Sequence, residues 1–196
     1  FEPERTTNPD GGIFHDQFIA IQRLRQLLPA DIEIIVKEHP SQFLMAERGP
    51  KGRSPLFYKM LKSLEGITLI DPSFDSMSLQ RNCEFVATIT GSVAIENAII
   101  GKPAIIFGNA WFKGCPNIVA WEDISSYESL VSRETANRDE IERYLTKMFM
   151  RSCIVANQNI SAQSRNIEFL SEEFDVLQVL GAVDLMSSFF HNQKVN

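Results

Sequence analysis

The segment that most constrains the fold is residues 85–108. It contains two continuously apolar runs, separated by a turn of small residues, a short helix-like stretch and a Gly-Lys-Pro stop. Apolar runs without alternation are typical of parallel strands that are covered on both faces. The segment therefore predicts a strand, a helix and a second parallel strand, joined by a right-handed crossover.

The turn inside this unit carries the first candidate chemistry, because it is made of Thr90, Gly91 and Ser92. Such a turn presents backbone N–H groups and a hydroxyl at the positive end of a helix dipole, which suits a bound phosphate. Glu96 follows Ser92 by four residues, so it lies about one turn further along the same side of the helix and can reach toward the ligand. The simpler alternative is that Ser92 only caps the helix and Glu96 is a solvated carboxylate.

A second polar cluster follows the apolar run at residues 32–36. It consists of Lys37, Glu38, His39 and Pro40. In open α/β sheets, ligands bind outside the carboxyl ends of the strands, and this cluster falls at such an end. Pro40 holds His39 in an extended conformation and prevents a helix from beginning there. We expect His39 to face the Ser92 turn and to contact a ligand held by it.

Two further pairs of residues are candidates for ligand contact. Gly11 and Gly12 open the first helix, and their small size allows a substrate or another domain to approach closely, although a simple turn also explains them. Asp75 and Ser76 follow a predicted strand and fall at the same sheet edge, where they could contact a base or a ribose. A cap for the next helix is the alternative for this pair.

Three motif blocks resemble bacterial capsule polysaccharide biosynthesis proteins. They are EPERTTNPDGG at residues 2–12, VKEHPSQ at residues 36–42, and ATITGS at residues 87–92 followed by Glu96 and Gly-Lys-Pro. The resemblance covers about residues 1–120. It implies a glycosyltransferase of the GT-B type, with two Rossmann-like domains, related to capsular Kdo transferases.

The resemblance also implies roles for particular residues. In such enzymes a His-Pro pair and a serine-bearing turn hold the phosphate of a nucleotide-activated sugar, often a CMP-sugar. Those roles fall on His39 with Pro40, and on Ser92 with its preceding turn. His39 is then the catalytic residue that acts on the leaving phosphate, while Lys37 and Glu38 belong to the same motif.

The implied transferase needs no metal or other cofactor, which agrees with the lack of an Asp-x-Asp motif. Its general base is expected in an N-terminal domain of the same protein. Two alternatives remain open. The Gly-Ser-x-x-x-Glu arrangement also resembles sugar-nucleotide epimerases, in which the Glu holds the ribose of a UDP-sugar. The second alternative is a non-catalytic Rossmann-like module of a capsule assembly complex.

Periodicity along the chain predicts a Rossmann-like α/β domain with a doubly wound parallel sheet. Helices are expected at residues 14–28, 55–64, 76–81 and 138–154, and strands at residues 32–36, 67–70, 85–89, 104–107 and 118–121. We expect residues 1–155 to form the nucleotide-sugar-binding domain and residues 156–196 a helical extension packed on it. The polar segment at residues 2–7 is typical of a strand exit, so the chain is expected to be a fragment or a processed form.

Composition restricts the partners. The net charge of −6 argues against nucleic acid, which requires a concentrated basic face. The apolar passage at residues 85–107 is too interrupted to span a membrane, and no secretory signal is visible. We expect a cytoplasmic protein, with the inner face of the cytoplasmic membrane as an alternative. Its expected partners are a nucleotide-sugar donor, a glycan or glycolipid acceptor and the N-terminal domain.

Three cysteines and a few loop residues complete the prediction. Cys83, Cys115 and Cys153 are odd in number and lack metal-binding spacing, which indicates reduced thiols, with Cys115 the more exposed by context. Arg53 lies in a loop that could close over a phosphate, although a solvated loop is the default. Trp111 and its neighbour Phe112 could stack on a base, although packing against the domain is more common.

Overall fold

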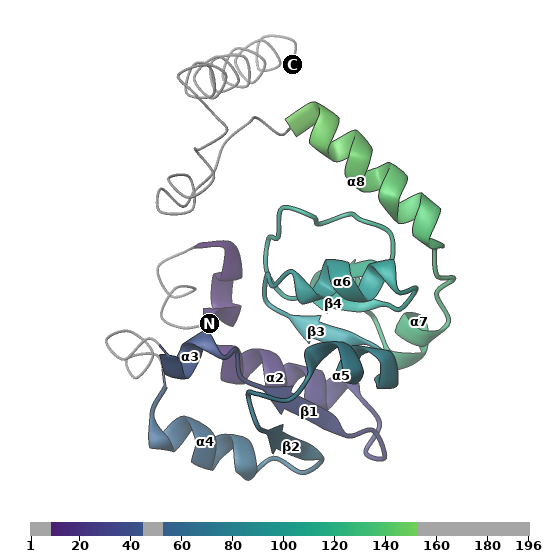
Figure 1. Cartoon of the computed structure of the whole chain (residues 1–196). Helices are drawn as coiled ribbons and strands as arrows, with labels where there is room; N and C mark the ends of the chain where they lie inside the picture. Colours follow the sequence, from purple (N-terminus) through teal and green to yellow (C-terminus); the bar gives the residue numbers. More distant parts are fainter. Residues whose placement is uncertain (1–8, 45–52, 153–196) are drawn as a thin grey trace, which may run out of the picture. The chain divides into compact units, whose positions relative to one another are not determined.

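The computed structural model of the chain describes residues 9–44 and 53–152 (Figure 1). The chain divides into two compact units, Phe1–Glu142 and Arg143–Asn196. The fold given below is that of the first unit. The helical extension expected at residues 156–196, together with Cys153, lies outside the described residues, and the domain boundary at residue 155 stays a prediction.

The described chain combines helical elements with short strands. The helical elements are η1 (Pro9–His15), α2 (Gln17–Leu27), α3 (Ser41–Leu44), α4 (Pro55–Lys62), α5 (Ser76–Asn82), α6 (Val93–Ile99), η3 (Trp121–Asp123), α7 (Tyr127–Val131) and α8 (Arg138–Ser152). The strands are β1 (Ile34–Lys37), β2 (Ile67–Ile70), β3 (Val86–Thr88), β4 (Ala104–Ile106) and β5 (Ile118–Ala120). Each strand expected from an apolar run is present, and the α/β class is confirmed.

All of the strand pairs among the described residues are parallel. β1 pairs with β2, so that Ile34 lies opposite Ile67. β4 lies between β3 and β5, with Ala87 opposite Ile105 and Ile105 opposite Val119. The described strands thus form a two-stranded and a three-stranded sheet, which supports the predicted Rossmann-like architecture.

The first helix begins later than its apolar periodicity predicts. Gly12 has φ 51° and ψ −132°, so a kinked 3₁₀ segment, η1, precedes α2. The side chain of Asp16 then caps α2 by accepting the N–H of Phe18 at 3.0 Å. An oxygen acceptor at this position satisfies one of the free N–H groups of the first turn, which fixes the start of α2.

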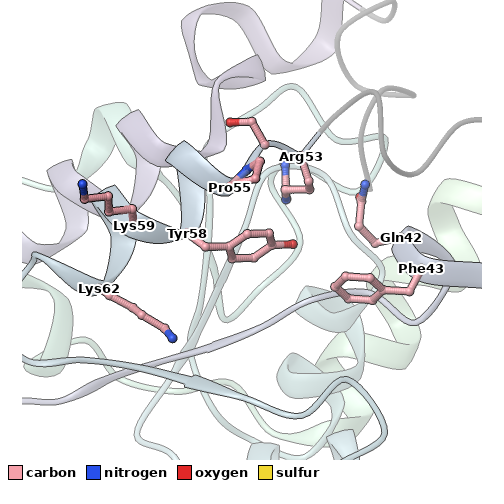
Figure 2. Close-up of a pocket in the computed structure, with 8 residues that line it drawn as sticks. Gln42, Phe43, Arg53, Pro55, Tyr58, Lys59 and Lys62 are labelled. Carbon is pink, nitrogen blue, oxygen red and sulfur yellow. The ribbon is translucent and has the colours of Figure 1, made fainter.

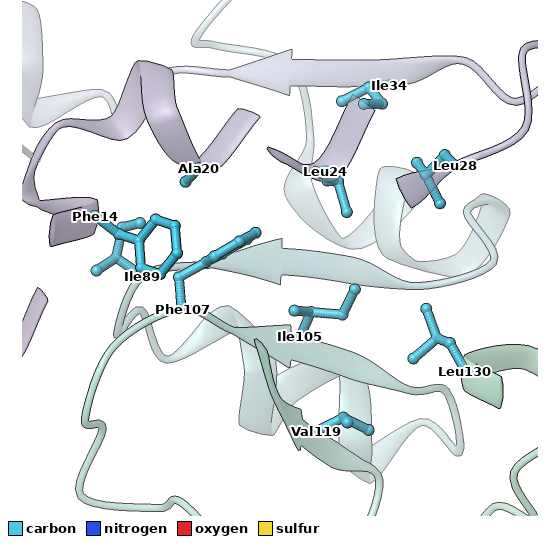
Figure 3. Close-up of a cluster of buried hydrophobic side chains, with 10 residues drawn as sticks. All are labelled: Phe14, Ala20, Leu24, Leu28, Ile34, Ile89, Ile105, Phe107, Val119 and Leu130. Atoms are coloured by element: carbon cyan, nitrogen blue, oxygen red, sulfur yellow. The ribbon is translucent and has the colours of Figure 1, made fainter. Parts of the chain in front are cut away.

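One hydrophobic core connects both sheets through α2 (Figure 3). Its buried members are Phe14, Ala20, Leu24, Leu28, Ile34, Ile89, Ile105, Phe107, Val119 and Leu130. Successive strand residues point to opposite faces, so Ala104 and Ile106 lie on the face opposite Ile105. Helix α6 packs against this sheet, and both Ala104 and Ile106 are completely buried. The middle strand β4 is therefore covered on both faces, as predicted.

The same prediction is wrong for β3. Val86 and Thr88 are only half-buried, and Ala87 is exposed. Among the described residues β3 is an edge strand with β4 on one side only, whereas β5, the other edge strand of this sheet, is buried in all three residues. An apolar run indicates a strand but does not report how many neighbours it has.

The core assignment predicts the cost of removing a central side chain. Ile105 has no exposed surface at the centre of β4, so Ile105→Ala should lower the free energy of unfolding by about 2–5 kcal/mol. Ile13→Ala is the control, because Ile13 is exposed and its loss should change stability by no more than about 0.5 kcal/mol. Urea denaturation measures both. Equal effects of the two substitutions would contradict this core.

Candidate functional site

The predicted phosphate turn lies at the carboxyl end of β3. Gly91 donates its backbone N–H to Thr88 Oγ1 at 3.1 Å, which closes the turn before α6. A Cβ built on Gly91 would come within 2.7 Å of that same oxygen. Glycine is therefore needed here for the turn itself, and any side chain at this position has to displace Thr88. Whether Gly91 also approaches a ligand stays a prediction.

Ser92 does not act as the simple side-chain cap that was the alternative for this position. It occupies the N-cap of α6 with helical dihedral angles, and its side chain makes no capping hydrogen bond. Instead, Ser92 Oγ donates to Glu96 Oε1 at 3.1 Å, across one helical turn. The spacing of four residues had placed these two side chains on the same side of the helix.

Glu96 is held by a second donor that comes from a different helix. Gln80 Nε2, on α5, donates to Glu96 Oε2 at 3.1 Å, and the Gln80 side chain is buried. Each carboxylate oxygen of Glu96 thus has one protein donor. Because an ionised carboxylate offers about four acceptor positions, two remain for a ligand. Glu96 itself is exposed, so those positions are accessible.

Lys102 fixes α5 beside α6 and so positions Gln80. Its Nζ donates to the backbone carbonyls of Gln80, Arg81 and Cys83, at 3.2, 2.6 and 2.6 Å. These carbonyls belong to the last turn of α5 and the residue after it, where a cation also interacts favourably with the helix dipole. Lys102 of the Gly-Lys-Pro stop therefore holds α5 in the position from which Gln80 reaches Glu96.

The 3₁₀ segment η1 packs against the same sheet edge. Asn109 donates its N–H to the Asp10 carbonyl at 2.7 Å. A Cβ on Gly108 would lie 2.6 Å from that carbonyl oxygen and 2.8 Å from Thr90 Cγ2, so only glycine permits this approach. The ring of Phe14 packs on Phe107, with centroids 4.8 Å apart, and anchors η1 there.

This packing brings the predicted glycine pair beside the turn. Gly11 is buried, and a Cβ built on it would touch Ile89 Cγ2 at 3.4 Å. Gly12 is exposed and has a positive φ, which favours glycine. Next to them, Thr90 Oγ1 is buried and has no hydrogen-bond partner among the described residues. A buried hydroxyl without a partner is costly, and a ligand atom is one way to satisfy it.

The end of β1 is organised by an ion pair that the sequence did not indicate. Glu38 is buried, and both of its oxygens accept from Arg53, at 2.6 Å from Nε and 3.1 Å from Nη2. The Tyr58 hydroxyl donates to the same carboxylate at 3.1 Å. Arg53 also donates to Gln17 Oε1 at 2.5 Å and lies over the Phe57 ring. The interpretation of Arg53 as a solvated loop residue is therefore wrong.

His39 is exposed in the loop after β1, directly before α3. Its carbonyl accepts the N–H of Gln42 at 2.8 Å, and the Pro40 carbonyl accepts that of Phe43 at 3.2 Å. Pro40 thus delays the helix by only one residue, because α3 begins at Ser41. Lys37 is the half-buried last residue of β1. Contacts of these residues with a ligand, and of His39 with the Ser92 turn, stay predictions.

Asp75 has the capping role that was its alternative. Its carboxylate accepts the N–H groups of Met77 and Ser78, at 3.3 and 2.8 Å, at the start of α5. Ser76 is the first residue of that helix and is half-buried. Asp75 therefore has a structural function whether or not it contacts a ligand.

A separate cavity of about 740 Å³ lies between α3 and α4 (Figure 2). Its described lining residues are Gln42, Phe43, Arg53, Ser54, Pro55, Tyr58, Lys59 and Lys62. Of the residues singled out from the sequence, Arg53 alone is among them. The only signal for it in the sequence is the spacing of Lys59 and Lys62, which places two ammonium groups on neighbouring positions of one helix.

The aromatic loop after β4 folds inward more than its composition suggested. Phe112 is completely buried, whereas Trp111 is 60% exposed and packs edge-on against it. Cys115 is also buried, so the expectation of an exposed thiol is wrong. Burial raises the pKa of Cys115 to about 11, and burial likewise raises the pKa of Cys83. Both are protonated near neutral pH and are poor nucleophiles.

Within residues 9–44 and 53–152, no group of three or more histidine, cysteine, aspartate or glutamate side chains lies close enough together to hold a metal ion. No helix in that part of the chain has the length and apolar character needed to cross a membrane.

The environment of Glu38 predicts a measurable change at Tyr58. Burial, and then the Glu38 carboxylate, raise the pKa of Tyr58 from 10.0 to about 12. The folded state therefore holds this proton more tightly, and the resulting stabilisation is complete below pH 10 and is lost as the pH rises to about 12.

We expect Glu38→Gln to move the pKa of Tyr58 part of the way back toward 10.0, because the carboxylate charge is removed while burial remains. Absorbance of the ionised phenols follows the tyrosine titration, and comparison with Tyr58→Phe identifies the part of the signal that comes from Tyr58. Loss of one partner of a buried pair costs about 3–5 kcal/mol of stability. Circular dichroism is therefore used to check that the variants are folded. An unchanged Tyr58 pKa in folded Glu38→Gln would contradict the role of the carboxylate.

A family model described as capsule polysaccharide biosynthesis protein matches residues 9–155. No curated protein and no solved structure matches the chain. The matched region covers well over half of the 196 residues and includes β1 to β5, the Ser92 turn and His39. The chain therefore belongs to the capsule polysaccharide biosynthesis protein family.

Proposed function

We propose that this chain is the donor-binding part of a glycosyltransferase that acts in the synthesis of capsule or another surface polysaccharide. Family membership supports a role in capsule synthesis. The observation that carries the finer proposal is the Glu96 carboxylate, held between Ser92 and Gln80 at the carboxyl end of β3. The donor is a nucleotide-activated sugar, with a CMP-sugar favoured by the resemblance of the motifs.

Glu96 is suited to recognise a ribose. Its two protein donors hold the carboxylate in place, so little side-chain freedom is lost when a ligand binds. The two remaining acceptor positions can each take a hydroxyl proton, and adjacent ribose hydroxyls present such a pair. A carboxylate that was free to rotate would have to be ordered by the ligand itself.

The turn beside Glu96 is suited to the phosphate of the donor. The Thr90 hydroxyl, which has no hydrogen-bond partner in the described part of the chain, lies there close to the exposed Ser92. Negative charge builds on the leaving phosphate as the glycosidic bond breaks, and hydrogen-bond donors fixed before the reaction stabilise it. We assign the remaining donor to His39, which hydrogen-bonds the phosphate or protonates it as it leaves.

In this proposal no metal or other cofactor takes part, because the hydrogen-bond donors stabilise the leaving group. The acceptor is a glycan or glycolipid, and the base that activates its hydroxyl belongs to an N-terminal domain of the same protein. The reaction takes place in the cytoplasm or at the inner face of the cytoplasmic membrane.

A nucleotide screen separates this proposal from its two alternatives. The intact protein is titrated calorimetrically with CMP, UDP, GDP and CDP. Binding of CMP in preference to UDP supports the transferase with a CMP-sugar donor. Preference for UDP favours the epimerase-like alternative, and the lack of any nucleotide binding favours a non-catalytic module of a capsule assembly complex.

Substitution of Glu96 tests the ribose contact. Glu96→Gln keeps the shape of the side chain but removes its charge, and a hydrogen bond to a charged group contributes about 1.5–3 kcal/mol. We expect about tenfold or greater loss of nucleotide affinity by calorimetry. Glu134→Gln, an exposed residue far along the chain, is the control and should bind as the parent does. If Glu96→Gln still distinguishes ribonucleotides from their 2′- and 3′-deoxy forms as the parent does, Glu96 does not hold the ribose.

Substitution of His39 tests the leaving-group role. In the intact enzyme at saturating donor, His39→Ala should lower kcat by about 10²-fold or more, because general-acid and oxyanion-type contributions have this size. Nucleotide affinity should change much less, since the interaction strengthens only as the bond breaks. Steady-state kinetics of His39→Ala and His39→Asn decide the matter. A kcat near that of the parent would make His39 an ordinary loop residue.

A further inference from the structure

Helix α4 carries apolar side chains on its exposed side. Leu56 and Met60 are 61% and 39% exposed, whereas Leu61 in the same helix is completely buried. Residues four apart lie on one side of a helix, so Leu56 and Met60 form a continuous apolar strip. Helix α4 packs against β2, and a helix that only covers a sheet has polar residues on its outer side. Packing within the described chain therefore does not explain this strip.

Helix α3 adds a third exposed apolar side chain. Phe43 is 56% exposed and, like Tyr58, lines the cavity between α3 and α4. Figure 2 shows that Phe43 comes from α3 and Tyr58 from α4, so both helices present an aromatic ring to the same cavity. Exposed apolar residues that gather beside polar ones mark a site of interaction, whereas single ones are ordinary.

Two lysines border the same cavity. Lys59 and Lys62 are exposed residues of α4, and neither forms an ion pair within the described part of the chain. No aspartate or glutamate is among the described lining residues, and none occurs in residues 54–64. Arg53, the third cation of the lining, is neutralised by the buried Glu38. This part of the surface is thus positive in a protein whose net charge is −6.

Buried interactions hold α4 in place beneath these residues. Tyr58 donates its hydroxyl to Glu38 at 3.1 Å, and Arg53 pairs with the same carboxylate. The Arg53 guanidinium lies 4.4 Å from the centroid of the Phe57 ring, and Ser54 caps the helix by accepting the Phe57 N–H at 3.2 Å. A fixed helix therefore presents the apolar strip, so little conformational freedom is lost when a partner covers it.

The combination of lysine with exposed leucine, methionine and phenylalanine decides between classes of partner. Lysine is depleted in protein–protein interfaces, because its flexible and strongly hydrated side chain is costly to bury. Nucleic acid is bound through many phosphate contacts, and two lysines supply too few. A bilayer with anionic headgroups suits both kinds of side chain, since apolar groups enter its acyl region while lysine ammonium groups stay beside the lipid phosphates.

We propose that α3 and α4 form a docking surface for an anionic lipid bilayer. This α3–α4 surface consists of Phe43, Leu56, Lys59, Met60 and Lys62. Its apolar side chains enter the boundary between headgroups and acyl chains, and its lysines bind lipid phosphates at the cavity, whose volume of about 740 Å³ accommodates a headgroup. The proposal goes beyond the proposed function, which leaves open where the chain acts and assigns nothing to these residues.

Docking would bring the lipid surface close to the loop of His39. The N–H of Gln42, a cavity residue on α3, donates to the His39 carbonyl at 2.8 Å, and α3 begins at Ser41. A glycolipid acceptor of the proposed transfer reaction would then be held in the same bilayer that the chain contacts. This consequence rests on the proposed function, whereas docking itself does not.

Binding to vesicles tests the proposal without any nucleotide. The intact protein is sedimented with vesicles of phosphatidylcholine, and with vesicles in which part of this lipid is replaced by the anionic phosphatidylglycerol. We expect binding to the anionic vesicles to be about tenfold or more tighter, and to weaken as salt is raised, because salt screens exposed charges. Equal binding to both kinds of vesicle, or binding to neither, would overturn the proposal.

A pair of charge variants locates the docking surface. Lys59→Gln combined with Lys62→Gln should weaken binding to the anionic vesicles about tenfold or more, because each lysine near such a surface contributes about fivefold. The matched control combines Arg23→Gln with Arg81→Gln, which removes the same charge from exposed positions on α2 and α5. The control should change binding by about twofold at most, because charges that do not contact the lipid are screened.

A second pair of variants tests insertion of the apolar strip. Leu56→Ser should weaken binding to the anionic vesicles about tenfold or more, because burial of a leucine side chain is lost. Val131→Ser is the control, since Val131 is 48% exposed on α7, outside the α3–α4 surface. Circular dichroism checks that each variant is folded. If the lysine and leucine variants bind as the parent does, or if the controls lose as much binding, the proposal is wrong.

The outcome is separate from that of the nucleotide experiments. Glu96→Gln should bind the anionic vesicles as the parent does, because Glu96 lies outside the α3–α4 surface. Vesicle binding by a protein that binds no nucleotide would support docking and contradict only the proposed function.

Discussion

Burial of β4 on both faces is the constraint on which the other features depend. Its three residues have no exposed surface, with Ile105 against the core of α2 and its two neighbours on the side of α6. A strand enclosed in this way has no room for polar side chains along its length. Polar chemistry is therefore restricted to the ends of the strands, where Thr90, Ser92 and Gly108 lie.

Features that depend on neighbouring residues were predictable from the sequence. The strand at residues 67–70 follows from its apolar composition and the Asp-Pro that ends it, and α5 follows from the capping Asp75. The pairing of Ser92 with Glu96 also follows, because the helix repeat places residues four apart on one side. In each case the deciding interaction spans at most four residues.

Features that depend on tertiary contacts were not predictable. Glu38 and Arg53 are 15 residues apart, and nothing in the sequence indicates that they form a buried ion pair. Gln80 reaches Glu96 from another helix, which Lys102 holds in place through three carbonyls. The partial exposure of β3 was not predictable either, because an apolar run does not reveal where in a sheet the strand lies.

Polar residues follow both β1 and β3, at the strand ends where doubly wound sheets bind their ligands. His39 follows β1 and Ser92 follows β3. Ile34 of β1 and Ile89, just beyond β3, pack into one hydrophobic core. Gly11 of η1 also reaches this edge, because a Cβ built on it would touch Ile89 Cγ2 at 3.4 Å. The packing that stabilises the fold therefore also holds in place the strand ends from which the residues of the candidate site extend.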